Sequence, residues 1–171
     1  MRPCIAFAAM VVLLTGLATL PGRAQGPDLP PLPRLQGVCQ LSDGPAQGWS
    51  RYTASSLSVR VSFPAGWSAR EVGGRLELVA PDRVMARLRR VHTGGLSPVD
   101  WLRDQARRPD GARCRMVILG GFQGRQCFDS SADLWTTYLA GGGRVLAVEV
   151  PGSVTRQIHC GILMGIEDLS R

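Results

Sequence analysis

The sequence predicts an α+β domain in which an antiparallel β-sheet of about six to seven strands is flanked by helices. Three observations support this prediction. Apolar and polar residues alternate with a period of two over several short segments, which is the pattern of half-buried strands. Glycine, proline and aspartate form short turns between these segments, so neighbouring strands should run antiparallel. Two other segments repeat their apolar residues at helical spacing.

The first expected strand shows the alternation most clearly. Its apolar residues are Leu57, Val59, Val61 and Phe63. Serine and arginine separate them, so one face of this strand should be buried. Turn residues divide the following sequence into further strand-like segments, which are residues 76–79, 84–91, 113–119, 122–128, 134–140 and 144–150.

Two helices are expected. Ser97 can cap the first one, Pro98 suits its first position, and Pro109 ends it. Asp100 supplies the carboxylate that returns to the cap. The second helix is expected from Ser153 onward, because apolar residues recur there at helical spacing, and it should cover the sheet.

The N-terminal segment 1–24 has the features of a secretory signal peptide. Arg2 provides a positive start, residues 5–20 form an apolar run, and residues 22–24 offer the small residues that a signal peptidase reads. An uncleaved membrane anchor is the alternative, but the run is shorter than the roughly 20 residues that span a bilayer. We therefore expect cleavage after Ala24.

A proline-rich linker and one domain are expected after the signal peptide. Residues 25–48 begin with a stretch that contains four prolines, a composition that favours an extended spacer. Residues 49–171 carry the strand and helix patterns. Their length suits a single domain with one core.

The chain is basic, and all of its 20 positively charged residues are arginines, against 13 acidic residues, for a net charge of +7. Loss of Arg2 and Arg23 with the signal peptide would lower this charge by two. Arginine without lysine, together with many alanines and glycines, is typical of a GC-rich bacterial genome. A positive surface favours acidic partners or anionic envelope polymers. The arginines are scattered, however, and do not form the clustered patch of a nucleic-acid-binding protein.

Four cysteines follow the signal peptide: Cys39, Cys114, Cys127 and Cys160. An even number in an exported chain predicts two disulfides, and zinc binding would favour a C-x-x-C pair, which is absent. If residues 120–121 form a two-residue hairpin turn, Cys114 faces Cys127, which leaves Cys39 to pair with Cys160. A longer turn would shift this register, and four cysteines allow three connectivities.

No residue pattern identifies a catalytic, cofactor-binding or metal site. Two histidines, His92 and His159, are too few for a metal centre of several imidazoles, and no lysine is present for a P-loop. A hydrolase triad can be assembled on paper around His159, but no G-x-S-x-G motif accompanies it. Its other members would be Ser130 or Ser131 and Asp129 or Asp133.

A short motif and the order of the elements carry a resemblance to a known family. The first strand runs into Phe63-Pro64-Ala65-Gly66-Trp67, and a later strand ends in Ala80-Pro81-Asp82. With the strand, helix, four-strand meander and closing helix that follow, residues 52–171 resemble the PsbP and Mog1-like family. The resemblance implies an α/β/α sandwich and proteins that act mostly by binding. None of the family's functional residues carries over to this sequence.

These observations lead to a functional hypothesis. We expect an exported, non-enzymatic binding or adaptor protein of the bacterial cell envelope, periplasmic or secreted, that docks an envelope protein. Nucleic-acid binding and stable membrane insertion after signal cleavage are not expected. One alternative is a small secreted hydrolase that uses His159 with a nearby serine. Another is an inhibitor of a secreted enzyme that presents the loop around Gly141.

Overall fold

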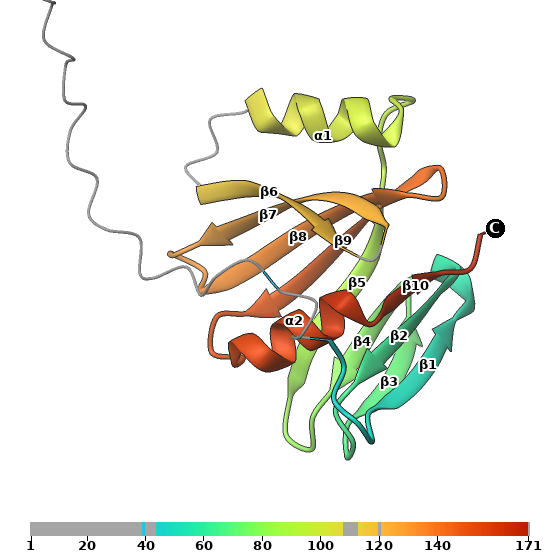
Figure 1. Ribbon diagram of the computed structural model, residues 1–171, viewed down its shortest axis with the longest axis vertical. Helices are drawn as coiled ribbons and strands as arrows, with labels where there is room; N and C mark the ends of the chain where they lie inside the picture. Colours follow the sequence, from blue (N-terminus) through green and yellow to red (C-terminus); the bar gives the residue numbers. More distant parts are fainter. Residues whose placement is uncertain (1–38, 40–43, 108–112, 120, 171) are drawn as a thin grey trace, which may run out of the picture. The chain divides into compact units, whose positions relative to one another are not determined.

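The computed structural model describes residue 39 and residues 44–107, 113–119 and 121–170 (Figure 1). The expected signal peptide lies outside this part, as does most of the expected linker, so both stay predictions. The elements are β1 (Ser50–Ala54), η2 (Ser55–Leu57), β2 (Val59–Phe63), β3 (Ser68–Val72), β4 (Arg75–Val79), β5 (Val84–Val91), α1 (Pro98–Arg107), β6 (Arg113–Leu119), β7 (Phe122–Asp129), β8 (Leu134–Gly141), β9 (Arg144–Pro151), α2 (Arg156–Met164) and β10 (Ile166–Asp168).

The strands of the described part form two antiparallel sheets. The large sheet has seven strands in the order β3-β4-β5-β9-β8-β7-β6, and the small sheet has three in the order β1-β2-β10. The β6–β7–β8–β9 part is the meander expected from the sequence. Strand β5 pairs with β9 at the centre of the large sheet, and this pairing joins β3, β4 and β5 to the later strands β6 to β9.

The expected α+β class with an α/β/α sandwich is wrong, because the protein is β-rich, with ten strands and two short helices in the described part. Strands β1, β3 and β10 were not expected. Strand β1 alternates in burial, but its sequence is mostly polar and hides the pattern. Strand β3 is almost entirely exposed, and β10 has three residues. The strand expected at 57–63 starts at Val59 and joins the small sheet, which takes much of the place of a helical layer.

One main core unites the two sheets and α2. The expected buried face of β2 is confirmed, since its apolar residues are at most 4% exposed. They belong to one cluster with apolar residues of the large sheet and of α2. Members of this cluster include Val59, Val61, Phe63, Leu76, Leu78, Leu88, Leu146, Val148, Ile162 and Leu163. Burial of these side chains is the main source of stability.

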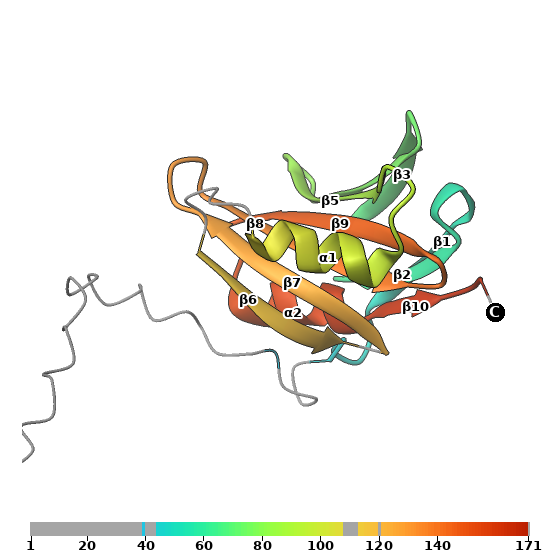
Figure 2. The ribbon, with the colours of Figure 1, turned by 90° about the horizontal axis from the view of Figure 1, so that it is seen from above.

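Helix α1 covers part of the opposite face of the large sheet, on the other side from α2 (Figure 2). Trp101 packs edge-on against Tyr138 of β8, with ring centroids 5.1 Å apart. The predicted cap is confirmed: the backbone N–H of Asp100 donates to the Ser97 hydroxyl at 3.2 Å, and this hydroxyl donates to the Asp100 carboxylate at 2.6 Å. Neither described helix is long and apolar enough to cross a membrane.

Helix α2 is shorter than the sequence pattern predicted. It ends at Met164, and the chain continues as β10, which pairs with β2. At the junction, the N–H of Ser62 in β2 donates to the carbonyl of Gly165 at 3.1 Å. A Cβ atom at Gly165 would collide with Ser62 and Pro45, so only glycine fits where the helix gives way to the strand.

The structure contains the two disulfides that the two-residue turn predicted. Leu119 faces Phe122 across that turn, and the register then places Cys114 opposite Cys127, with Cα atoms 4.0 Å apart. Cys39 pairs with Cys160, and their Cα atoms are 5.3 Å apart. The second bridge ties the chain before β1 to α2.

We expect the two disulfides to contribute different amounts to stability, because they close loops of different length. The double variant Cys39→Ser, Cys160→Ser opens a loop with a sequence separation of 121 and should lower the free energy of unfolding by about 5 kcal/mol. The variant Cys114→Ser, Cys127→Ser opens a separation of 13 and should cost about 3 kcal/mol. Guanidinium denaturation measures both, and a larger loss in the hairpin variant would contradict the loop-length argument.

Candidate functional site

A buried polar cluster lies between the large sheet and α2. One cross-strand row of the sheet places Arg115 of β6 opposite Gln126 of β7, and Gln126 opposite Thr137 of β8. His159 of α2 completes the group, which we name the His159 cluster: Arg115, Gln126, Thr137 and His159. Gln126 and Thr137 are buried, and His159 is 7% exposed. The row is polar on the face whose other residues form the core.

Hydrogen bonds within the His159 cluster fix the protonation of the imidazole. Arg115 donates to the Gln126 Oε1 through Nε at 3.1 Å and Nη2 at 2.6 Å. The Gln126 amide nitrogen therefore donates, to the Thr137 hydroxyl at 3.3 Å, and it faces the His159 Nε2 at 3.5 Å. The His159 Nε2 is thus the acceptor, and the ring proton lies on Nδ1.

The surroundings of His159 favour a neutral imidazole. Burial lowers its pKa to about 4, and the positive charge of Arg115 acts in the same direction. The Trp135 ring packs against it, with centroids 5.7 Å apart. A neutral, buried histidine whose Nε2 faces an amide belongs to a polar network of the core, and burial disfavours the charged form that proton exchange with a substrate would need.

The fold does not bring together the residues of the hydrolase triad that the sequence allowed around His159. The Asp129 carboxylate accepts hydrogen bonds from the Ser131 hydroxyl at 2.6 Å and from the backbone N–H groups of Ser131 and Ala132, so it organises the β7–β8 turn. These bonds, with that of the Ser131 hydroxyl first, lower the pKa of Asp129. Within the described residues, no hydrogen bond joins His159 to a serine or an aspartate. No three potential metal ligands gather anywhere in this part of the chain.

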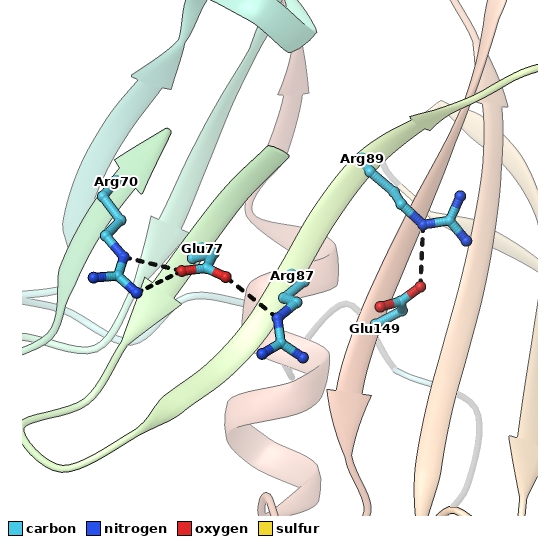
Figure 3. Close-up of polar contacts among 5 residues, drawn as sticks. All are labelled: Arg70, Glu77, Arg87, Arg89 and Glu149. Atoms are coloured by element: carbon cyan, nitrogen blue, oxygen red, sulfur yellow. Dashed lines mark hydrogen bonds and ion pairs between the residues drawn. The ribbon is translucent and has the colours of Figure 1, made fainter. Parts of the chain in front are cut away.

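The outer face of β3, β4, β5 and β9 carries a ladder of charged side chains (Figure 3). Arg70 donates to the Glu77 carboxylate through Nη2 at 2.7 Å and Nε at 2.9 Å, and Arg87 reaches the other oxygen at 3.4 Å. The hydrogen bond from Arg70 is the main reason that the pKa of Glu77 is lowered. One strand further, Arg89 donates to Glu149 at 3.2 Å.

An unfavourable pair lies beside this ladder. The register places Arg75 of β4 directly opposite Arg89 of β5. Arg75 is exposed and forms no ion pair with any described carboxylate. Like charges directly opposite each other destabilise a sheet. We name the patch formed by Arg70, Arg75, Arg87 and Arg89, with Glu77 and Glu149, the arginine face.

The sequence contained only part of the signal for the arginine face. Arg87 and Arg89 alternate along one strand, so a common face was readable from period two alone. Arg70 and Arg75 join them through the β3–β4–β5 pairing, and β3 was not predicted. The face is therefore a product of sheet register.

Comparisons with known proteins add a distant structural likeness. No family model matches the chain, and no curated protein matches it. Among solved structures, a protein of Bacteroides thetaiotaomicron VPI-5482, determined at 1.50 Å resolution, is similar over 69% of this chain and 47% of its own, with 15% sequence identity and a TM-score of 0.47. This chain thus spans about half the length of that protein. Likeness at this level carries no argument about function.

We expect His159 to make the protein less stable on mild acidification. Its pKa is about 4 in the folded protein and 6.5 ordinarily, so the unfolded chain binds a proton in this window that the folded chain does not. The free energy of unfolding should fall by about 3 kcal/mol as the pH is lowered from above 6.5 to 4. Urea denaturation at a series of pH values measures this change.

The variant His159→Gln is the control for this experiment, because it should flatten the dependence between pH 6.5 and 5, above the range in which Glu77, whose pKa is lowered from 4.5, loses its own contribution. Asp168, whose pKa is lowered from 3.8 to about 2, loses its contribution only below pH 3.8, so the two effects separate. An equally steep loss in His159→Gln would assign the dependence to another group.

We also expect Arg75→Thr to stabilise the protein. The substitution removes the repulsion from Arg89 and places a β-branched residue in a strand, which should raise the free energy of unfolding by about 0.5 kcal/mol. Arg70→Thr is the matched control, since it also removes an exposed arginine but loses the ion pair with Glu77. Urea denaturation compares the two, and a destabilised Arg75→Thr would contradict the repulsion.

Proposed function

We propose that this protein is an exported, non-enzymatic binding or adaptor protein of the bacterial cell envelope, and that its arginine face docks an acidic surface of an envelope protein. The observation that carries the proposal is Arg75, an exposed arginine opposite another arginine and without a carboxylate partner in the described part of the chain. A sheet that had only to be stable would place a neutral or acidic residue there.

The net positive charge of the arginine face indicates that the partner surface is acidic. The arginine face carries four arginines and two glutamates, so positive charge remains after every internal ion pair is formed. Arg70 and Arg87 keep half or more of their side-chain surface exposed, at 60% and 50%. Planar guanidinium groups bind carboxylates through two parallel hydrogen bonds, and partner carboxylates can add to those already formed with Glu77 and Glu149.

The spacing of the strands sets the size of the complementary surface. Neighbouring strands lie about 4.8 Å apart, so the arginines of β3, β4 and β5 cover a width of about 10 Å. Acidic residues one turn apart on a partner helix, or alternating on a partner strand, can match this spacing. The interaction should accelerate association and weaken as salt is added.

Binding fits the described residues better than catalysis does. His159 is buried and neutral, and the Ser131 hydroxyl donates a hydrogen bond to Asp129 at the β7–β8 turn. The signal-like segment 1–24 and the two disulfides support export, since disulfides persist in oxidising compartments.

The test compares partner capture by the wild type and by Arg75→Glu, Arg87→Glu. Each protein is crosslinked in an envelope extract of the producing bacterium, captured proteins are identified by mass spectrometry, and the main one is purified for affinity measurement. We expect the double variant to lose affinity by about 100-fold, because two exposed charges are reversed at the centre of the contact.

Arg51→Glu is the matched control, because Arg51 is also an exposed arginine but lies on β1 of the small sheet. It should leave the affinity for the purified protein unchanged, and wild-type binding should weaken with increasing salt. Unchanged binding by Arg75→Glu, Arg87→Glu, or an equal loss with Arg51→Glu, would overturn the role of the arginine face.

A further inference from the structure

A second basic region lies at the end of the large sheet, in a hollow of about 400 Å³. It forms where the chain leaves β5 beside the β8–β9 hairpin, because Val91 of β5 is the register partner of Val145 of β9. We name it the hairpin pocket. Its lining residues are Arg90, Val91, His92, Thr93, Gly142, Gly143 and Arg144.

Arg144 is a buried lining residue of the hairpin pocket, and hydrogen bonds hold its side chain in place. It is 6% exposed, and its Nη2 donates to the Asp168 carboxylate at 2.8 Å and to the Ser58 carbonyl at 2.9 Å. Burial by itself would raise the pKa of Asp168, but hydrogen bonds from Ser170 and Arg144 hold it at about 2, so the ion pair stays charged. The guanidinium is therefore held in one orientation.

One donor of this guanidinium is unused. The Nε atom of Arg144 is buried and has no hydrogen-bond partner among the described residues. This nitrogen is enclosed by the protein, so a ligand in the hollow meets it only when the groups around it shift, and it is then a donor with no internal acceptor. An anionic oxygen is the strongest acceptor for such a donor.

Arg90 supplies positive charge that the described residues do not balance, and His92 lies close to it. Arg90 is in β5, His92 follows the end of that strand, and both line the pocket. Arg90 forms no ion pair with any described carboxylate, and no carboxylate is among the lining residues of the pocket. Since Asp168 balances Arg144, the charge left for a ligand is that of Arg90, with His92 beside it.

The hairpin lets a ligand approach the backbone. Gly142 and Gly143 both have positive φ, at 55° and 71°. A Cβ atom at Gly143 would meet nothing within 4 Å, so the backbone is open there, whereas Gly142 is covered by Ser170, Asp168 and Arg144. Consecutive backbone N–H groups in such turns form concave sites for anions. Thr93 adds a hydroxyl that can donate to the same group.

We propose that the hairpin pocket binds the phosphate group of a small molecule or of an anionic lipid. The Arg90 guanidinium, the His92 imidazole, the Thr93 hydroxyl and the glycine turn offer the kinds of donor that a phosphate uses, and the volume lies within the range of small-molecule sites. The site is separate from the arginine face, because strand alternation directs Arg90 to the opposite side of β5 from Arg87 and Arg89.

The experiment titrates the disulfide-bonded protein with inorganic phosphate, glycerol phosphate and acetate while amide NMR signals are recorded. We expect phosphate and glycerol phosphate to shift the signals of residues 92–93 and 142–143, and acetate to bind at least tenfold more weakly. A parallel arm measures sedimentation with phosphatidylglycerol vesicles against neutral phosphatidylcholine vesicles. Binding in solution alone assigns a free phosphorylated ligand, and binding to the anionic vesicles as well assigns a lipid headgroup.

Arg90→Gln and Arg87→Gln form the matched pair of variants, since they remove the same charge from opposite sides of one strand. Arg90→Gln should weaken phosphate binding about tenfold, and Arg87→Gln should leave it unchanged. The inference is overturned if phosphate shifts no pocket signal, if acetate binds equally well, or if both variants weaken binding alike. Loss of partner capture in Arg75→Glu, Arg87→Glu with intact phosphate binding would separate this site from the proposed docking role.

Discussion

The large sheet has one face lined with leucine and valine side chains, and the way in which this face is removed from water determines most of the architecture. Helix α2 covers one part of it, and the small sheet covers another. Two glycines of the α2 segment permit the close approach. A Cβ atom at Gly161 would collide with Trp49, and one at Gly165 with Ser62 and Pro45. Apolar burial thus accounts for both the second sheet and the shortness of α2.

The polar features follow from where this covering stops. Toward β6, the inner face of the sheet turns polar, and Gln126 and Thr137 satisfy each other beneath α2 while Arg115 lies nearer to solvent. On the outer face, α1 packs against β7 and β8. At Val91 the end of β5 also packs against the α1 cluster, and the outer face of β3, β4 and the rest of β5 carries most of the charged side chains of the arginine face. Their charges are arranged by strand pairing, which explains why ion pairs and the repulsive Arg75–Arg89 pair occur side by side.

Local patterns were sufficient for the elements that are stabilised locally. The cap at Ser97 and the turn that places Cys114 opposite Cys127 depend on residues close in sequence, and the structure confirms both. Turn residues located β5 and the four-strand meander, because short turns join most of these strands. Strand β3 was not predicted, because its residues are almost all exposed and show no apolar alternation.

The candidate sites were less accessible to sequence reasoning, because they depend on contacts between distant segments. Arg144 meets Ser58 and Asp168, which are 86 and 24 residues away. Nothing in the sequence near Arg144 indicates either partner. His159 was singled out as a possible base, but its neutral state is set by Arg115 and by burial beneath the sheet. Register and burial are properties of the folded chain, and they decide here which charged groups meet.

The two disulfides also order the events of oxidative folding. Cys114 and Cys127 are 13 residues apart on one hairpin, so their bond can form as soon as that hairpin closes. Cys39 and Cys160 are 121 residues apart, and their bond requires α2 to be in place against the chain that precedes β1. During synthesis Cys39 emerges long before Cys160, so its native partner is missing until almost the whole chain has been made. In that interval Cys39 is open to mispairing with either cysteine of the hairpin, and early closure of the hairpin removes both wrong partners.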